Sequence, residues 1–334
     1  MTVAPPPARL LGAANAVKTW WGARLSGLAR RAGWTTAALG YPGYAAGGRA
    51  RVHGRLLLAP AATQPDARAD VPGWRRLLTL EQPHGEVDVE LAGVRVRARA
   101  DDAGLIDVTV DVDLPAGAHR ARLLLPGRPP ATAVVHAAAP DARRGVVCDI
   151  DDTVWITGVR SPLRAAWRTL AGTASTRRPV AGMAALLTRL AQESPDSPFV
   201  YLSNGPWNLA GPITAFLARH GFPPGAIMLT DWGISQAAWF RSGPAHKRAV
   251  LEQLATDLPA VAWALVGDDG EHDPAIYRAF AQAHPDRATA VALRTVGAPR
   301  SPARARVGSV PVVAAADGSA LARALEAAGV LPAT

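Results

Sequence analysis

Residues 145–158 read GVVCDIDDTVWITG, a short apolar run that ends in the aspartates Asp149, Asp151 and Asp152. Continuous apolar runs of this length are typical of strands in parallel sheets, because such strands are covered on both faces. Carboxylates this close together repel one another unless protons or a cation compensate. The stretch therefore predicts a buried strand that carries an acidic cluster at its end. An acidic turn or a helix cap is the structural alternative.

Five similar apolar runs follow this one along the chain, namely PFVYLS, AIMLT, VAWALVG, ATAVAL and VPVVAA. Helical patterns separate them, for example at residues 182–193 and 246–258. This alternation predicts an α/β domain over residues 143–334, with a Rossmann-like parallel sheet and helices on both faces. In such sheets ligands bind beyond the carboxyl ends of the strands, so the polar residues that follow each run are the candidates for function.

Polar residues of three kinds follow the later runs. Ser203 and Asn204 end the second run, where a hydroxyl and the amides of a starting helix can cradle an anion, although an ordinary N-cap has the same composition. Lys247 is one of only two lysines in the chain. Its ammonium is suited to bind a phosphoryl oxygen, and an ordinary surface lysine is the less favoured alternative. The fourth run is followed by a second acidic cluster, made of Asp268, Asp269, Glu271 and Asp273.

Five segments in order carry a resemblance to a known family: DIDDTVWITGV, STRRPVAGMAALL, YLSNGPWNL, FRSGPAHKRAVL and VGDDGEHDPAIY. The Asp-x-Asp-x-Thr motif resembles that of the haloacid dehalogenase (HAD) superfamily of phosphotransferases. Together the segments resemble the catalytic domain of the fungal actin-patch phosphatidate phosphatases and their bacterial relatives, over about residues 145–296. The resemblance implies a HAD-like fold and a phosphoric monoester hydrolase that converts phosphatidate to diacylglycerol and phosphate.

The resemblance also implies roles for the residues already singled out. Asp149 would be the nucleophile that forms an aspartyl-phosphate, and Asp151 the general acid and base. Ser203, Asn204 and Lys247 would hold the phosphoryl oxygens, and Thr153 would orient the loop. Mg²⁺ would be the cofactor, and its expected ligands are Asp149, Asp151, Asp268 and Asp273. Either Asp269 or Asp273 could support the ion through water. The family tolerates a small residue at Asp269, which has no assigned role.

Short spacers separate Thr153, Ser203 and Lys247, and the helices of the fold use up most of their length. We therefore expect a minimal cap and an open site, which suits a phosphate on a membrane surface. A phosphorylated lipid is the favoured substrate. The alternatives are a phosphoprotein, a polynucleotide end, or a docking module without activity whose acidic sites are vestigial.

Residues 41–140 predict a small antiparallel β-sandwich. Arginines alternate with apolar residues in VRVRARA, and acids alternate with apolar residues in LIDVTVDVD after the DDAG turn. We expect these two stretches to form one hairpin, with Arg99 opposite Asp107 and Arg95 opposite Asp111. The arginine row is thus interpreted as cross-strand charge pairing, and no nucleic-acid partner is expected.

The formal net charge is +9, from 36 basic and 27 acidic side chains. The first 65 residues contain no acid but hold Arg9, Lys18, Arg24, Arg30, Arg31, Arg49, Arg51 and Arg55. An apolar stripe from Ala8 to about Gly33 predicts an amphipathic helix within residues 1–40. It could bind an anionic membrane through Trp20, Trp21 and its basic residues, or it could pack against the rest of the protein.

Cys148 is the only cysteine, which excludes a disulfide within the chain and favours a reducing compartment. No apolar run approaches the roughly 20 residues of a membrane span, and the amino terminus does not read as a secretory signal. We expect a cytoplasmic protein that is peripheral to the inner face of the membrane.

Overall fold

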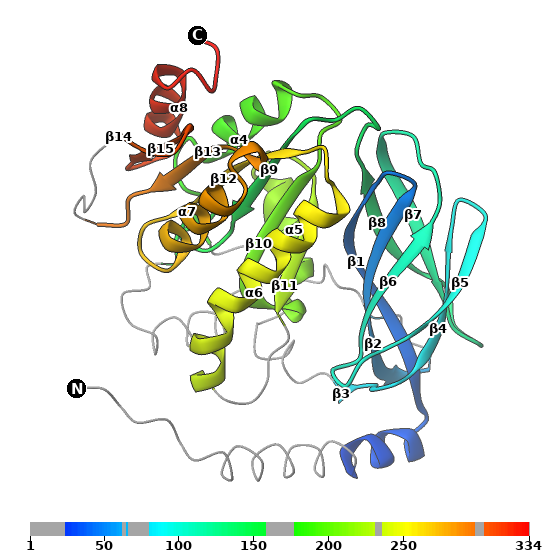
Figure 1. Ribbon diagram of the computed structural model, residues 1–334. Coiled ribbons are helices and arrows are strands. Elements are labelled where there is room, and N and C mark those ends of the chain that lie inside the picture. The colour runs from blue at the N-terminus through cyan, green and yellow to red at the C-terminus, as the bar shows by residue number, and fades with distance from the viewer. Residues whose placement is uncertain are drawn as a thin grey trace.

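The structure is a computed structural model, and it describes residues 24–61, 65, 80–157, 177–230, 236–297 and 304–333. Two units lie side by side in it, an all-β unit formed by residues 34–137 and an α/β unit that begins at residue 144 (Figure 1). The α/β unit agrees with the fold class expected from the alternating apolar runs. None of the helices in the described part of the chain is long and apolar enough to cross a membrane.

One sheet of seven strands forms the centre of the α/β unit. Its strands are β9 (Arg144–Asp149), β10 (Phe199–Pro206), β11 (Ala226–Thr230), β12 (Ala262–Asp268), β13 (Ala288–Arg294), β14 (Arg304–Val307) and β15 (Val310–Ala315). Their order is β11-β10-β9-β12-β13-β15-β14, and all neighbours are parallel except β14 and β15. All six predicted apolar runs are strands, and β9 lies centrally between β10 and β12. The carboxyl ends of these three strands therefore meet at one edge of the sheet.

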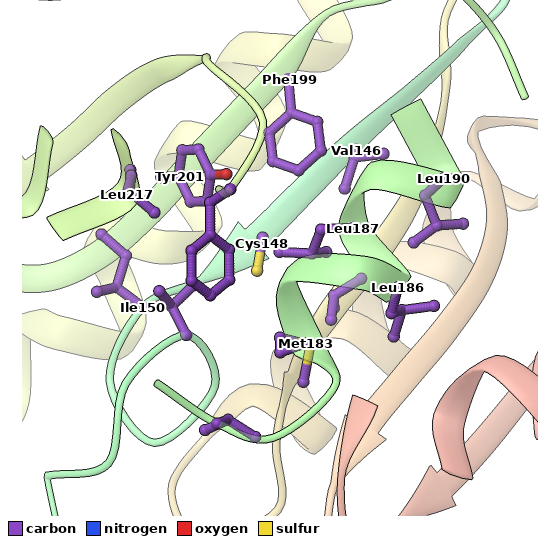
Figure 2. Packing of buried hydrophobic residues seen from close by; sticks show 14 of the residues in the cluster. Val146, Cys148, Ile150, Met183, Leu186, Leu187, Leu190, Phe199, Tyr201 and Leu217 are labelled. Atoms are coloured by element: carbon purple, nitrogen blue, oxygen red, sulfur yellow. The ribbon is translucent and has the colours of Figure 1, made fainter. Parts of the chain in front are cut away.

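Helices cover both faces of this sheet, as the sequence predicts. They are α4 (Met183–Gln192), α5 (Ala210–Arg219), α6 (Gln236–Asp257), α7 (Asp273–Ala283) and α8 (Gly318–Ala327), with the 3₁₀ turns η2 (Trp207–Leu209) and η3 (Pro285–Arg287). One core joins α4, α5 and α8 to Cys148 and its face of the sheet, and a second joins α6 and α7 to Val147 and the opposite face. Figure 2 shows the apolar side of α4 packed towards β9. Successive residues of β9 belong to different cores, so both faces of the strand are buried.

The all-β unit is one hydrogen-bonded sheet. Its strands are β1 (Trp34–Ala46), β2 (Arg49–Pro60), β3 (Leu80–Glu81), β4 (Glu86–Leu91), β5 (Val94–Arg99), β6 (Leu105–Asp111), β7 (Gly117–Leu124) and β8 (Ala131–Ala137). The order is β3-β2-β1-β8-β7-β4-β5, with β6 paired to β2. Val52, Val89, Ile106 and Val135 from distant strands share one core. The sheet thus curls around its own interior, and the described strands do not form the two separate sheets of the expected sandwich.

The predicted hairpin between β5 and β6 is wrong. β5 pairs instead with β4, and β6 pairs with β2, so Arg99 lies opposite Glu86 and Asp107 lies opposite His53. The cause is the tight turn at Ala92 and Gly93, which both have positive φ, because a two-residue turn of this kind closes a hairpin locally. The expected pairing of Arg95 with Asp111 is lost for the same reason.

The arginine row is nevertheless charge-paired, with acids of β4. Asp88 accepts hydrogen bonds from Arg95 at 2.7 Å and from Arg97 at 3.0 Å. Arg97 also lies 3.8 Å from Glu86. The interpretation of these arginines as cross-strand partners holds, whereas the partner strand differs.

The basic amino-terminal region divides between two kinds of structure. Residues 24–31 are helical, and residues 34–40 already belong to β1, so the described part of the predicted helix ends before Gly33. Residues 1–23, including Trp20 and Trp21, lie outside the described residues. Arg51 and Arg55 are part of β2 and bind acids of the same sheet, Asp107 and Glu81. Part of the basic charge is therefore structural.

The two units meet along β1 and β2. Tyr41 stacks on Trp207 with ring centroids 5.2 Å apart. Tyr44 donates a hydrogen bond of 2.6 Å to Asp257 near the end of α6, and Arg51 lies 3.4 Å from the same carboxylate. The β unit thus contacts both the segment after β10 and the helix that carries Lys247.

Candidate active site

The chain turns sharply after β9, in a loop fixed by Asp152. This residue has a φ of 53°, in the left-handed region that L-residues rarely adopt. Its side chain accepts hydrogen bonds from the backbone nitrogen of Thr157 at 2.9 Å and from the Thr157 hydroxyl. Arg294, at the end of β13, donates to the Asp152 carbonyl oxygen at 2.6 Å. These bonds hold the loop above the carboxyl end of the sheet.

A buried cluster of opposite charges lies at this end of the sheet. The Lys247 ammonium donates to Oδ1 of Asp149 at 2.6 Å and to Oδ1 of Asp273 at 2.5 Å. Asp149, Asp268 and Asp273 each offer a carboxylate oxygen within 4.8 Å of the other two. All four side chains are buried. We call these four residues the active-site cluster; it contains three acids and one base.

Burial and mutual repulsion displace the pKa values in this cluster. Burial raises the pKa of Asp149 well above its ordinary range, and Lys247 only partly offsets this. Burial and the neighbouring Asp273 raise the pKa of Asp268 to about 7. Burial alone would lower the pKa of Lys247, but the carboxylates of Asp149 and Asp273 more than offset it, and the pKa is raised. The single positive charge of Lys247 therefore does not balance the three acids of the cluster.

The same cluster has the chemistry of a divalent cation site. Oδ2 of Asp149 and Oδ2 of Asp273 are buried, and no described residue donates a hydrogen bond to either. Buried carboxylate oxygens without donors are costly, and hard oxygen ligands favour Mg²⁺ over softer metals. A side chain at Gly267 would collide with Oδ2 of Asp273, since its Cβ would lie 2.4 Å away. Glycine at this position leaves room for that oxygen.

Asp151 lies in a separate hydrogen-bonded group. Ser203 donates to its Oδ2 at 2.9 Å, and the Trp155 indole donates to its Oδ1 at 2.9 Å. The backbone nitrogen of Gly205 donates to the Ser203 hydroxyl at 2.9 Å. The Asp151 side chain is 44% exposed, unlike that of Asp149. It therefore faces the open side of the site, and its carboxylate is absent from the group of potential metal ligands.

The remaining predicted residues have varied surroundings. The backbone carbonyl of Asn204 accepts a hydrogen bond of 2.9 Å from Thr230 at the end of β11. Thr153 is fully buried, and no described residue bonds its hydroxyl. Asp269 accepts a hydrogen bond of 2.7 Å from the backbone nitrogen of Val296. This bond gives Asp269 a structural role, fixing the segment after β13, which the sequence did not assign.

Sequence reasoning missed three residues that contact the site. Trp155 bonds Asp151, Arg177 lies beside both, and Arg294 bonds the loop. Arg294 had a usable signal, because it follows a predicted strand in the same way as Ser203. Trp155 and Arg177 lie within two of the five family-like segments, but their contact joins residues distant in sequence, which no local pattern reveals.

Comparison with known proteins finds relatives of the residues that carry the site. Residues 144–295 match the family described as phosphatidate phosphatase APP1, catalytic domain. The chain is also 27% identical over 151 residues to the phosphatidate phosphatase APP1 of Saccharomyces cerevisiae. That alignment covers 45% of this chain and 25% of the yeast protein, so the chain spans about a quarter of its relative. The resemblance expected from the five segments is confirmed over residues 144–295.

Two solved structures share a weaker likeness. The HAD domain of the effector protein Lem4 from Legionella pneumophila is 14% identical, with a TM-score of 0.29, and the match covers 46% of this chain and 86% of that one. A carbohydrate acetylesterase from Xanthomonas citri is 12% identical, with a TM-score of 0.29, over 85% of this chain and 72% of the other. Scores this low carry no argument about fold or activity.

Proposed function

We propose that the protein is a Mg²⁺-dependent phosphatase that converts phosphatidate to diacylglycerol and phosphate. The observation that carries the proposal is the active-site cluster, which places Asp149, Lys247 and two further acids in contact at the carboxyl ends of adjacent strands. The similarity of residues 144–295 to a phosphatidate phosphatase catalytic domain supports the substrate.

Asp149 acts as the nucleophile in the proposed reaction. One of its carboxylate oxygens forms a bond to phosphorus while the bond from phosphorus to the leaving oxygen breaks, and Asp151 gives its proton to that oxygen. Asp151 then takes a proton from water, which attacks the phosphorus of the aspartyl-phosphate and releases phosphate. Asp151 is placed for both steps because it is next-but-one to Asp149 and partly exposed.

Lys247 and Ser203 hold the phosphoryl oxygens in this proposal. Both side chains now donate to carboxylates, Lys247 to Asp149 and Ser203 to Asp151. A phosphate that enters between these groups offers them acceptor oxygens of the same kind. The donors can therefore exchange carboxylate oxygens for phosphoryl oxygens, and a bound cation would offset the charge left on the carboxylates.

Asp149, Asp268 and Asp273 would hold Mg²⁺, with the Asp151 carbonyl as a further oxygen. The ion supplies positive charge that offsets repulsion between the anionic nucleophile and the phosphate. This charge also favours the ionised form of Asp149, whose pKa burial otherwise raises. Asp273 therefore has a double function in the proposal, since its Oδ1 already fixes Lys247.

We further propose that the protein is cytoplasmic and that residues 24–31 bring it to an anionic membrane. Leu25 and Leu28 are 46% and 60% exposed on this helix, and Arg30 and Arg31 are exposed beside them. In Figure 1 the helix, drawn in blue, lies at the lower end of the β unit. Exposed leucines next to basic side chains suit the boundary between headgroups and acyl chains.

Phosphate release from mixed micelles of phosphatidate tests the reaction. The wild type should release phosphate with Mg²⁺ and not with a chelator, and Asp149→Asn should release none. A phosphopeptide and an oligonucleotide with a 5′-phosphate serve as competing substrates. Turnover of either one without turnover of phosphatidate would contradict the lipid assignment, and no turnover of any substrate would contradict the enzyme class.

Flotation with vesicles tests the membrane contact separately. Wild type should float with vesicles that contain anionic lipid and not with vesicles of phosphatidylcholine alone. Leu25→Ser with Leu28→Ser should abolish flotation while hydrolysis of a soluble phosphomonoester stays unchanged. Unaltered flotation of this double variant would refute the role of the helix.

A further inference from the structure

We propose that Arg177 and Trp155 form a subsite for the leaving group of the substrate, and that it accepts an ester carbonyl oxygen near the scissile bond. The inference rests on the proposed function, because it concerns the glycerolipid that departs after phosphorus is attacked. It assigns specificity to residues outside the active-site cluster.

The position of Arg177 is fixed by backbone hydrogen bonds. The nitrogen of Ile156 donates to the carbonyl of Arg178 at 2.9 Å, and the nitrogen of Val180 donates to the carbonyl of Val154 at 3.0 Å. Trp155 also forms an isolated antiparallel bridge with Pro179. The segment that carries Arg177 is thus registered against the loop that carries Asp151, and it cannot shift independently of that loop.

The Arg177 guanidinium lies over a tryptophan ring, and no hydrogen bond joins it to another described residue. Its Cζ lies 3.9 Å from the centroid of the Trp155 ring, in a cation-π contact. Its Nη1 lies 3.8 Å from Oδ1 of Asp151, beyond hydrogen-bond distance. The side chain is only 15% exposed, and no described residue accepts a hydrogen bond from it. A guanidinium that lies over an aromatic ring keeps its N–H donors in its own plane, where a planar acceptor can bind them.

The location of this guanidinium determines which part of a substrate it can bind. The transferring phosphoryl group must face Asp149 and Lys247, whereas the leaving oxygen must face the acid Asp151. Arg177 approaches Asp151, and no described contact joins it to Lys247. It therefore lies beside the leaving group, where it can bind atoms a few bonds away from the scissile oxygen.

Acceptor oxygens at that distance distinguish a diacyl glycerolipid from simpler phosphomonoesters. The ester carbonyls of diacylglycerol follow the scissile oxygen by a few bonds, and they are planar acceptors. An ether-linked dialkyl analogue retains the glycerol backbone and the chains but lacks these carbonyls. Dodecyl phosphate lacks the glycerol as well. The three substrates share one phosphoryl group, so differences among them report only on the leaving group.

The experiment compares kcat/KM for these three substrates in identical mixed micelles with Mg²⁺. Wild type should prefer phosphatidate over its dialkyl analogue by about tenfold, the usual effect of one hydrogen bond to a charged group. Arg177→Met should lose this preference, so that its kcat/KM becomes equal for phosphatidate and the dialkyl analogue. Arg178→Met is the matched control, because it removes an exposed arginine next in sequence, and it should behave as wild type.

The variant Arg177→Lys distinguishes the effect of the planar guanidinium donors from the effect of the positive charge alone. It retains a positive charge beside Asp151 but lacks the planar fork, so it should also lose the diacyl preference. Equal losses on all three substrates in both variants would overturn the inference, since Arg177 would then act through Asp151. Unchanged preference in both variants would overturn it too.

The same data separate this inference from the proposed function. If wild type releases no phosphate from any of the three substrates, the proposed function fails and the inference fails with it. If wild type hydrolyses the diacyl and dialkyl lipids equally well, the inference alone fails.

Discussion

Two groups of charged residues, one in the α/β unit and one between the units, differ in how their charges are satisfied. The active-site cluster is buried and holds three acids against Lys247, and two of its carboxylate oxygens have no described donor. The interface cluster is formed by Tyr44, Arg51, Asp107 and Asp257, and its three charged side chains are partly exposed. Arg51 binds both oxygens of Asp107 at 2.8 Å, and Tyr44 donates to Asp257.

The pKa shifts of the acids differ in the same way. Burial alone would raise the pKa of Asp107, but His53 and Arg51 more than offset it, and the pKa is lowered. Burial raises the pKa of Asp149 and of Asp268. The interface cluster therefore stabilises the ionised form of Asp107, whereas burial in the active-site cluster disfavours the ionised forms of Asp149 and Asp268. Buried acids that outnumber their bases therefore indicate a functional site, whereas acids that are each paired with a base indicate a structural contact.

Removal of Lys247 should have the largest effect on this contrast. Lys247→Met leaves three buried acids without their base, and loss of one partner from a buried ion pair costs about 3–5 kcal/mol of unfolding free energy. We expect a lower melting temperature with a chelator, partial recovery with Mg²⁺ and no phosphatase activity. Thermal unfolding with and without Mg²⁺ measures this, and equal melting temperatures in the two conditions would contradict the metal site.

A smaller effect is expected at the interface cluster. Arg51→Met removes the base between Asp107 and Asp257, and a loss of about 1–3 kcal/mol follows from the charged hydrogen bonds involved. The partial exposure of all three groups keeps the cost below that of Lys247. Chemical denaturation should show the loss, independent of Mg²⁺, while kcat remains within about twofold of wild type. A loss of unfolding free energy that depends on Mg²⁺ would contradict the distinction between the two clusters.

The pH dependence of stability should distinguish the clusters next. Asp268 has a pKa of about 7 in the folded protein against an ordinary 3.8, so between these values the folded state keeps a proton that the unfolded state has lost. Stability of the metal-free protein should therefore fall as pH rises from about 4 to 7. Asp268→Asn should flatten this fall in denaturation curves recorded at several pH values.

Asp107→Asn is the matched control for that measurement. Its lowered pKa gives stability that is present above the ordinary value and is lost as pH falls. The substitution should therefore cost stability at neutral pH and little in acid, the opposite of Asp268→Asn. Parallel curves for the two variants would show that burial does not separate the clusters.

The smallest effect is expected at the exposed arginine row. Arg97→Gln removes contacts to Asp88 and Glu86 on the surface, where ion pairs often contribute nothing measurable. Its melting temperature and activity should equal those of wild type. A clear drop in melting temperature would mean that exposed pairing matters here as much as the interface cluster does.

Much of the α/β unit was predictable because its signals are local. Each buried parallel strand is a continuous apolar run, and the carboxyl ends of such strands meet, so the sequence alone places Asp149, Ser203 and Asp268 at one site. The β unit was less predictable. β5 had two acidic neighbours in sequence, β4 and β6, and the choice depended on the backbone conformation of the Ala92–Gly93 turn.

Contacts between distant segments were hidden from the sequence. The stacking of Arg177 on Trp155 depends on backbone hydrogen bonds between residues 154–156 and 178–180, which no composition or spacing encodes. The partners of Arg51 likewise come from β6 and α6. Charge counts placed this arginine in a basic region, whereas its actual surroundings are acidic.

The contact between β1 and β11 lies at an edge of the parallel sheet. β11 is a terminal strand of the parallel sheet, and its sequence AIMLT is apolar. Tyr41 packs in the core on one face of that sheet and Tyr44 in the core on the other, so the β unit straddles this edge. An uncovered apolar edge strand is a template for strand addition and aggregation. An α/β unit separated from the β unit would expose this edge strand. We therefore expect the α/β unit to aggregate when it is produced alone.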